Sequence, residues 1–386
     1  MLVKPTTDVL AKIKVIGVGG GGGNAINTMI SQHNIEGVEF ISVNTDAQAL
    51  KNSLAPIQLQ IGQELTRGLG VGGDPQLGGQ SAEESVDSIH EHLAGSDMVF
   101  LTCGMGGGTG TGATPIIASI AKNLNCLTVA VVTKPFLFEG KRRMDVALQG
   151  IEDLKDKVDT LIVVPNQRLL DIIDKNISFL EAMRQVDEVL AQGVKSISGL
   201  VTQTGLINVD FADVKTIMSD AGSAMMGIGK ASGENRASEA ARAAINSPLL
   251  EMSIDGATGV LLNVTGGIDM TMREVDDAAQ MISEVVDPGA NIIFGAMIDE
   301  EMKDELNITV LATGFGASPQ VMPTTRVQTT PRQDQTSDNR SNRPIEKPSV
   351  GVDQQTVKNP KPKLPDEPDV NDDELDVPAY LRRKGS

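Results

Sequence analysis

Apolar runs alternate with amphipathic stretches along the first half of the chain. Short apolar runs predict buried strands at residues 12–18, 38–43, 98–101, 127–133 and 161–164. Apolar residues three and four apart predict helices after residue 24 and at residues 82–93, 116–121 and 140–154. Residues 62–79 are rich in glycine and predict a surface loop. This alternation is typical of an α/β fold with a parallel sheet covered on both faces, whose ligand binds at the carboxyl ends of the strands.

A second pattern begins near residue 177. Apolar residues recur at intervals of three or four from Leu180 to Ile197 and predict a long central helix. After about residue 221 the pattern predicts a smaller α+β domain. Its expected helices span residues 234–246 and 272–286, and its expected strands span residues 259–264, 291–297 and 306–313. We expect hairpin-like pairing of strands at the end of this domain.

Composition divides the chain further. Residues 319–370 are rich in Pro, Gln, Asn and Asp and hold no aromatic residue, which predicts a disordered linker. Apolar residues return in 371–386 and predict a peptide that binds a groove on a partner. The expected order is a flexible N-terminus at 1–11, a ligand-binding α/β domain at 12–176, the central helix at 177–204, the α+β domain at 205–318, the linker and the terminal peptide.

Charge and cysteine content narrow the classes of function. The chain carries 33 Lys and Arg against 51 Asp and Glu, and this formal charge of −18 argues against a nucleic-acid partner. Cys103 and Cys126 do not make a disulfide framework, and Cys103 is expected to be a small buried residue. No stretch resembles a signal peptide or a membrane span, so we expect a cytoplasmic protein without membrane insertion.

Two glycine-rich segments, residues 19–23 and 104–112, each follow a predicted strand and precede a predicted helix. Free backbone N–H groups at a helix start attract anions, and glycines let a phosphate approach them closely. Thr109 and Thr111 add hydroxyl groups that can contact a phosphate or a phosphate-bound Mg²⁺. Neither segment ends in Gly-Lys-Ser/Thr, so neither is a Walker A loop with a phosphate-binding lysine.

The first glycine segment also permits a different class of ligand. Gly17, Gly19 and Gly22, with Asp46 after the next predicted strand, match the dinucleotide fingerprint of a nicotinamide-dependent dehydrogenase. That fold needs one glycine turn under its pyrophosphate. Two such segments at successive strand ends favour a triphosphate.

Acidic residues on and after the central helix are candidates for chemistry. Asp187 lies beside the apolar stripe of the helix, where it either pairs with Arg184 or accepts hydrogen bonds from a nucleobase. Asn208, Asp210 and Asp213 fall within six residues. Asp210 is expected to cap the helix that follows, but capping requires only one of the three.

Four motifs together resemble a known family. Residues 106–112, Gly-Gly-Gly-Thr-Gly-Thr-Gly, match the tubulin signature loop. With residues 20–24, 208–213 and 376–381 they make the chain similar to the FtsZ family, the bacterial relatives of tubulin, over its whole length. The resemblance implies a Rossmann-like GTPase domain joined by a long central helix to a smaller α+β domain.

The resemblance also implies a role for individual residues in binding GTP or GDP. The residues expected at the phosphates are Gly20, Gly21, Gly22, Gly23, Asn24, Ala25, Gly104, Gly107, Gly108, Thr109 and Gly110. Thr133 and Pro135 are expected to line the site, Glu139 and Arg143 to lie by the ribose and phosphates, and Asn166 and Asp187 to bind guanine. Met183 occupies the place where the family often has an aromatic residue on the base.

By the same resemblance, subunits stack head to tail into filaments that form the cytokinetic ring. Asn208, Asp210 and Asp213 are then expected to be catalytic residues at the GTP of the next subunit. Mg²⁺ is expected to bind mainly through the nucleotide phosphates, with no metal site made of protein side chains. A nucleotide-binding scaffold that does not hydrolyse GTP and a plasmid-partition filament remain alternatives.

The terminal peptide favours the cell-division branch of the family. Its expected partner-binding residues are Asp376, Val377, Pro378, Tyr380, Leu381 and Arg382. The resemblance implies that they bind membrane-tethering and regulatory division proteins. The filament is therefore expected in the cytoplasm at mid-cell, beneath the inner membrane.

Overall fold

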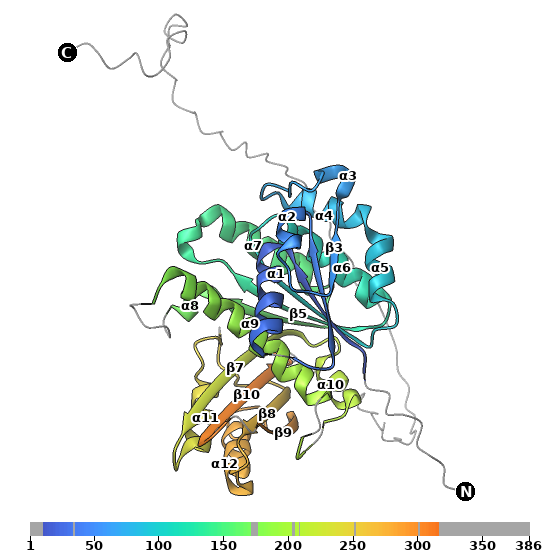
Figure 1. The fold of residues 1–386 in the computed structure, drawn as a ribbon. Helices are drawn as coiled ribbons and strands as arrows, with labels where there is room; N and C mark the ends of the chain where they lie inside the picture. The colour runs from blue at the N-terminus through green and yellow to red at the C-terminus, as the bar shows by residue number, and fades with distance from the viewer. Residues whose placement is uncertain are drawn as a thin grey trace, which may run out of the picture. The chain divides into compact units, whose positions relative to one another are not determined.

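The computed structural model describes residues 11–33, 35–170, 177–202, 205–207, 209–250, 252–299 and 302–315 (Figure 1). These residues belong to one compact unit within Met1–Met322. Asn208, the predicted linker and the predicted terminal peptide lie outside the described residues. In the part of the chain that is described, no helix is both long and apolar enough to cross a membrane.

The first half of the chain builds a parallel sheet, as the sequence predicts. Its strands run in the order β3-β2-β1-β4-β5-β6, and every neighbouring pair is parallel. Their bounds are β1 Ile13–Val18, β2 Val38–Asn44, β3 Ile57–Gln60, β4 Met98–Gly104, β5 Leu127–Lys134 and β6 Thr160–Pro165. The short edge strand β3 is an addition to the predicted set. The α/β class and the mostly parallel sheet are confirmed.

Helices cover both faces of this sheet. Alternate strand residues divide between two cores, with Val15 and Phe100 in one and Ile16 and Leu101 in the other. The helical segments are α1 Gly19–Thr28, η1 Met29–His33, α2 Ala47–Lys51, α3 Gln63–Thr66, α4 Pro75–Glu84, α5 Val86–Leu93, α6 Thr109–Asn123, η2 Leu137–Glu139, α7 Lys141–Lys155 and α8 Asn166–Leu169. Packing of two apolar faces fixes which way each strand residue points.

Two local predictions in this region are wrong. The expected loop at residues 62–79 contains α3 and the first half of α4, and the single helix expected at 82–93 is divided between α4 and α5. Asp74 explains the early start of α4, because its carboxylate accepts hydrogen bonds from the N–H groups of Gln76 and Leu77 and Pro75 follows it. Gly78 lets α4 approach the loop before α6, since a Cβ there would lie 2.4 Å from Gly108 O.

The central helix and the second half of the chain follow. α9, Phe179–Thr202, has 24 residues and packs against α1 and β5. The later elements are α10 Phe211–Met218, β7 Gly222–Ser232, α11 Arg236–Ile245, β8 Gly259–Gly266, α12 Met272–Ser283, β9 Asn291–Ile298 and β10 Glu305–Thr313. β7 pairs with β6 over three residue pairs and then carries the sheet on in the order β7-β10-β8-β9.

The hairpin expected at the end of the α+β domain is wrong. β9 and β10 are consecutive in sequence but do not pair, because β10 lies between β7 and β8, antiparallel to both, and β9 is parallel to β8 at the edge. β10 is apolar on both faces, with Ile308 and Val310 in one core and Leu311 in another. A strand buried on both faces belongs inside a sheet and not at its edge.

Candidate functional site

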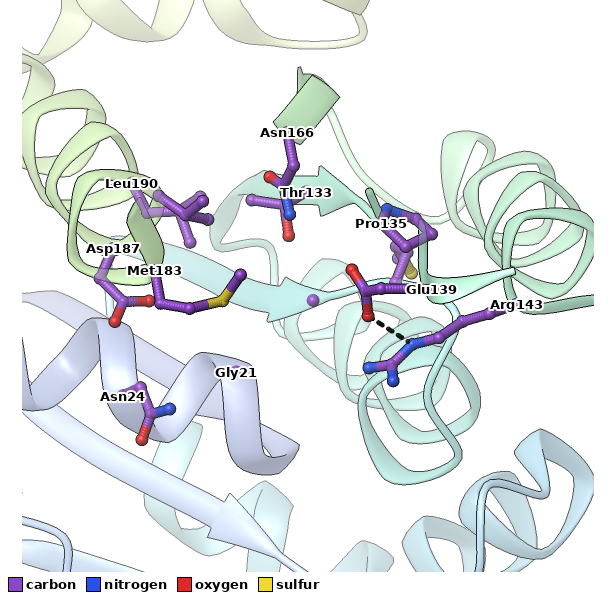
Figure 2. Close-up of a pocket in the computed structure, with 13 residues that line it drawn as sticks. Gly21, Asn24, Thr133, Pro135, Glu139, Arg143, Asn166, Met183, Asp187 and Leu190 are labelled. Atoms are coloured by element: carbon purple, nitrogen blue, oxygen red, sulfur yellow. Dashed lines mark ion pairs between the residues drawn. The ribbon is translucent and has the colours of Figure 1, made fainter. Parts of the chain in front are cut away.

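Two cavities lie next to each other at the carboxyl ends of the parallel strands and share Gly21, Gly104 and Arg143. The first has a cavity volume of about 180 Å³ and the second of about 340 Å³, and both open to solvent. The first is lined by Gly21, Asn24, Gly104, Met105, Thr133, Pro135, Glu139, Arg143, Asn166, Met183, Val186, Asp187 and Leu190 (Figure 2). It therefore contains every residue that the sequence assigns to the base and ribose.

The second cavity contains most of the predicted phosphate-binding residues. Those that line it are Gly20, Gly21, Gly104, Gly107, Gly108, Thr109 and Gly110, together with Arg143. Gly22, Gly23 and Ala25 line neither cavity, and Ala25 is fully buried in the core. Contact of these last three with a phosphate stays a prediction.

Two helices begin at the second cavity without a side-chain cap. The N-cap residues are Val18 for α1 and Gly108 for α6, and neither side chain accepts from the first turn. Several other helices in the described chain have such caps, from Asp46, Asp74, Asp210 and Thr271. The first N–H groups of α1 and α6 are therefore available to an anion, and both helix dipoles favour negative charge there.

The first glycine run is helical, which corrects the loop expected at residues 19–23. It forms the first turns of α1 because α1 lies very close to β1 and β4. A Cβ on Gly22 would lie 2.4 Å from Thr102 O, and one on Gly17 would lie 2.3 Å from Gly22 O. Only glycine permits this approach, and tight packing here outweighs the low helix propensity of glycine.

The two threonines of the signature loop have different roles. Thr111 is buried and its hydroxyl oxygen accepts a hydrogen bond of 2.9 Å from the Gly106 N–H, so it holds the loop and does not line either cavity. Thr109 lines the second cavity, and its hydroxyl lies 2.7 Å from the Thr45 hydroxyl. The expectation that both hydroxyls face a phosphate is therefore wrong for Thr111.

Sequence reasoning missed most of one wall of the second cavity, where it named only Asp46, as the acid of the dinucleotide alternative. Asn44, Thr45, Asp46 and residues 69–73 line it. The first three follow a predicted strand, so the rule that ligands bind at carboxyl strand ends was a usable signal for them. The sequence of residues 69–73 shows only that the segment is rich in glycine. Its position at the cavity depends on tertiary contacts, such as the bridge between Asp46 and Leu69.

Acceptor groups gather at the first cavity. Asp187 lies on α9, and burial raises the pKa of its carboxyl from 3.8 to about 7. The predicted alternative of a pair with Arg184 is wrong, since Arg184 Nη1 lies 3.5 Å from Glu181 Oε2. Asn166 Oδ1 is buried without a hydrogen-bond partner in the described structure. A ligand that offers N–H donors would satisfy both groups.

Arg143 supplies positive charge between the two cavities. Its Nε lies 3.1 Å from Glu139 Oε2, as Figure 2 shows. Glu139 Oε1 accepts a 2.8 Å hydrogen bond from the Phe136 N–H, so the carboxylate is fixed at both oxygens. Among the described residues that line the two cavities, Arg143 is the only Lys or Arg. Met183 lies on the opposite wall, beside Asp187.

The acidic residues after the central helix lie elsewhere. Asp210 caps α10, as predicted, with a 2.9 Å hydrogen bond from the Asp213 N–H to its Oδ1. Both acids are exposed and line neither cavity. α10 packs toward the amino ends of the strands, where Thr160 Oγ1, in the first residue of β6, donates to Met218 O. Figure 1 shows α2 and α3 near one end of the parallel strands and α10 toward the other end.

No cluster of three or more His, Cys, Asp or Glu side chains suited to a metal occurs among the described residues. Asp46 is the one carboxylate among the described residues that line the second cavity, and its Oδ1 accepts from the N–H groups of Gln48 and Ala49. A cation there would depend mainly on ligand oxygens. Cys103 is buried, as expected, and burial raises the pKa of its thiol to about 12.

Comparison with known proteins identifies the family to which this fold belongs. Residues 12–174 match the Tubulin/FtsZ family GTPase domain, and residues 222–316 match the FtsZ family C-terminal domain. An FtsZ dimer from M. jannaschii, solved empty, is 47% identical over 80% of this chain and 89% of its own, with a TM-score of 0.77. A point mutant of FtsZ from M. jannaschii is 48% identical over 79% of this chain and 91% of its own, with a TM-score of 0.76.

A more distant protein shares the fold. CetZ2 from Haloferax volcanii, in a GTPγS-bound protofilament, is 23% identical over 78% of this chain and 92% of its own, with a TM-score of 0.66. The two matching domains, the identity to FtsZ and the glycine-lined cavities agree with one another. The chain belongs to the tubulin/FtsZ family of GTPases, and its ligands are GTP and GDP.

Proposed function

We propose that this GTPase assembles head to tail into filaments, hydrolyses GTP where two subunits meet, and forms the cytokinetic ring at the division site. The position of the acidic residues carries the proposal. Asp210 and Asp213 are exposed near the amino ends of the parallel strands, and the cavities lie at the carboxyl ends. A second subunit stacked on the first brings these acids to the phosphates.

The residues of the two cavities fit GTP. The unpartnered Asn166 Oδ1 and the Asp187 carboxylate suit guanine, whose N1–H and amino group are both donors. The uncapped starts of α1 and α6 donate backbone N–H groups to the phosphates, and Arg143, held by Glu139, adds a positive charge. Mg²⁺, bound mainly through phosphate oxygens, offsets the remaining charge on the γ-phosphate.

Hydrolysis then depends on the neighbouring subunit. Asp210 and Asp213, with Asn208, orient the attacking water or accept its proton, while the amides and Arg143 stabilise charge on the transferred phosphate. An interface between two different surfaces that does not close into a ring extends into a filament. The M. jannaschii FtsZ relative was solved as a dimer, which supports association between copies.

GTP turnover measured against protein concentration, with sedimentation of the same samples, tests this proposal. We expect the rate per subunit to rise with concentration and the protein to sediment with GTP and not with GDP. A rate per subunit that is independent of concentration would contradict hydrolysis at an interface. NAD in a parallel sample is expected to be neither bound nor reduced, which excludes the dehydrogenase alternative.

The terminal peptide is proposed to bind membrane-tethering and regulatory division proteins, and so to place the filament at mid-cell. This part is supported by the sequence resemblance of residues 376–381 alone. Deletion of residues 372–384 is expected to leave sedimentation with GTP intact and to abolish binding of a membrane tether. Intact tether binding after this deletion would refute this role of the terminal peptide.

A further inference from the structure

A pair of buried hydroxyl groups lies behind the second cavity. Thr45 follows the end of β2, and Thr109 is the first residue of α6. Their Oγ1 atoms are 2.7 Å apart, Thr45 is fully buried, and 8% of Thr109 is exposed. Both residues line the second cavity, and neither lines the first.

The surroundings of the pair decide which hydroxyl donates. Among the described residues, the Thr45 hydroxyl has Thr109 as its hydrogen-bond partner and no other. A buried hydroxyl hydrogen without an acceptor is costly, so Thr45 donates to Thr109 Oγ1. The single hydrogen of Thr109 then points away from Thr45. Because Thr109 borders the cavity, that hydrogen is available to an anion there.

Thr45 also joins the pair to the cavity wall at residues 69–73. Its carbonyl oxygen lies 3.3 Å from Thr66 Oγ1, which donates to Gly62 O at 2.9 Å and accepts from the Gly68 N–H at 3.3 Å. The neighbouring Asp46 forms a bridge with Leu69. One residue therefore connects the start of α6 with the segment that closes the other side of the cavity.

We propose that Thr45 is a positioning residue for the terminal phosphate, acting by directing the Thr109 hydroxyl hydrogen into the second cavity. The proposal rests on the assignment of that cavity to phosphates. The base-binding residues Asn166 and Asp187 line only the first cavity, so the part of the second cavity that holds Thr109 is remote from the base. Thr45 thus favours GTP over GDP.

Thr45→Val and Thr45→Ser form a matched pair for the test, because Val removes the hydroxyl at similar volume and Ser keeps it. Dissociation constants for GDP and GTPγS are measured on the full chain by displacement of a fluorescent GDP, below the concentration at which the protein sediments. Loss of the hydrogen bond between the two uncharged hydroxyls, which orients Thr109, predicts that Thr45→Val weakens GTPγS by about three- to tenfold, and GDP by less than about twofold. Thr45→Ser is expected to match the unaltered chain for both nucleotides.

A double mutant separates the hydroxyl pair from general damage. Thr109→Val alone is expected to reproduce the selective loss, and adding Thr45→Val is expected to cause no further loss, because one chain of hydrogen bonds is broken in each case. Thr45→Ala replaces Thr45→Val if the valine variant does not fold. Additive losses would contradict the proposal.

The outcomes separate this inference from the site assignment. Equal weakening of GDP and GTPγS in Thr45→Val, or the same loss in Thr45→Ser, overturns the role of Thr45 and leaves the nucleotide site in place. Failure of the unaltered chain to bind either nucleotide overturns the assignment of the cavities, and the inference falls with it.

Discussion

Asp187 is a half-buried acidic residue of the first cavity. Burial raises the pKa of its carboxyl from 3.8 to about 7, so the empty site holds a proton at mildly acidic pH. Guanine donates from two N–H positions and needs acceptor oxygens, which the ionised carboxylate supplies. In the proposed complex, binding below pH 7 therefore requires release of that proton.

We expect GDP affinity to fall by up to about tenfold for each pH unit below 7, because each unit makes the ionised form tenfold rarer. Equilibrium titrations with GDP from pH 5.5 to 8 measure this dependence. Asp187→Asn is the control, since it removes the titrating group and is expected to flatten the profile at weaker affinity. A flat profile in the unaltered chain would show that Asp187 does not face the base.

The raised pKa of Asp187 affects folding of the nucleotide-free protein in the opposite direction, because low pH stabilises the folded state while it weakens nucleotide binding. Between pH 3.8 and about 7 the folded chain keeps a proton on Asp187 that the unfolded chain releases. Its contribution to stability is full below pH 3.8 and is lost as the pH rises through 7. At neutral pH the ionised Asp187 therefore lowers the stability of the empty protein, and at the same pH its carboxylate can accept hydrogen bonds from a nucleotide.

At the scale of elements, the close approach of α1 to the sheet depends on glycine. A Cβ at position 22 would lie 2.4 Å from Thr102 O, whereas one at Gly20 meets nothing within 4 Å. We expect Gly22→Ala to lower the unfolding free energy by about 1–3 kcal/mol, the range for overpacked cores, and to displace the start of α1. Chemical denaturation of Gly22→Ala, with Gly20→Ala as the control, measures this difference. Equal stabilities of the two variants would contradict the packing role.

α11 and α12 are joined by one buried cation. Arg236 is 5% exposed, with its Nη1 2.6 Å from Asp269 Oδ2 and its Nε 2.5 Å from Glu274 Oε1. The hydrogen bond from Arg236 lowers the pKa of Glu274 from 4.5 to about 2. Stability from this pair is therefore fully present above pH 4.5 and is lost as the pH falls through about 2.

We expect Arg236→Ala to lower the unfolding free energy by about 3 kcal/mol, because it leaves a carboxylate without its partner in a partly buried place. Arg242→Ala, at an exposed position on the same helix, is the matched control and is expected to change it by less than about 0.5 kcal/mol. Thermal unfolding at pH 7 compares the two. Similar melting temperatures would show that the buried cation does not hold the two helices together.

The elements that could be predicted are those whose own residues determine them. The strands around Val15, Phe100 and Val129 are apolar runs, and α9 has a regular apolar stripe, so both kinds follow from local pattern. β7 is not among the predicted strands, because glycines interrupt its apolar residues. Gly227 and Gly229 are instead required by α11, since Cβ atoms there would lie 2.2 Å from Ala244 O and 2.0 Å from Ala240 O.

The residues of the site also fall into two groups, those that local sequence predicts and those that only the assembled fold brings together. Its two glycine-rich segments were found from sequence because short motifs specify them. The Thr45 and Thr109 contact joins residues 64 positions apart, and the pairing of β10 with β7 and β8 is set by burial of both its faces. Interactions of this kind depend on the assembled fold, which no local pattern specifies.

For the whole molecule, the separation of the acids from the cavities predicts complementation between two inactive variants. Asp210→Asn keeps a capping side chain but loses the carboxylate, and Gly108→Val would place a side chain against Val71, which lies 2.4 Å from a Cβ at that position. Each variant alone is expected to lose most GTP turnover, the first with GTP binding intact. Equal mixtures are expected to recover part of it, because a Gly108→Val subunit can offer its acids to GTP on an Asp210→Asn subunit.

Turnover in a phosphate-release assay measures this recovery. Two Asp210→Asn preparations mixed together serve as the control and are expected to stay inactive. A mixture of the two different variants that stays equally inactive, although the proteins sediment together with GTP, would contradict catalysis across an interface.

The opposite placement of the cavities and α10 also makes the two ends of any stack unlike. In a row of n subunits joined in this way, only n − 1 nucleotides meet a neighbour's acids. The last nucleotide, at the end that exposes the cavity, is bound but lacks them. Short rows therefore hydrolyse less GTP per subunit than long ones. Every row also keeps one unhydrolysed GTP at the same end for as long as no further subunit binds there.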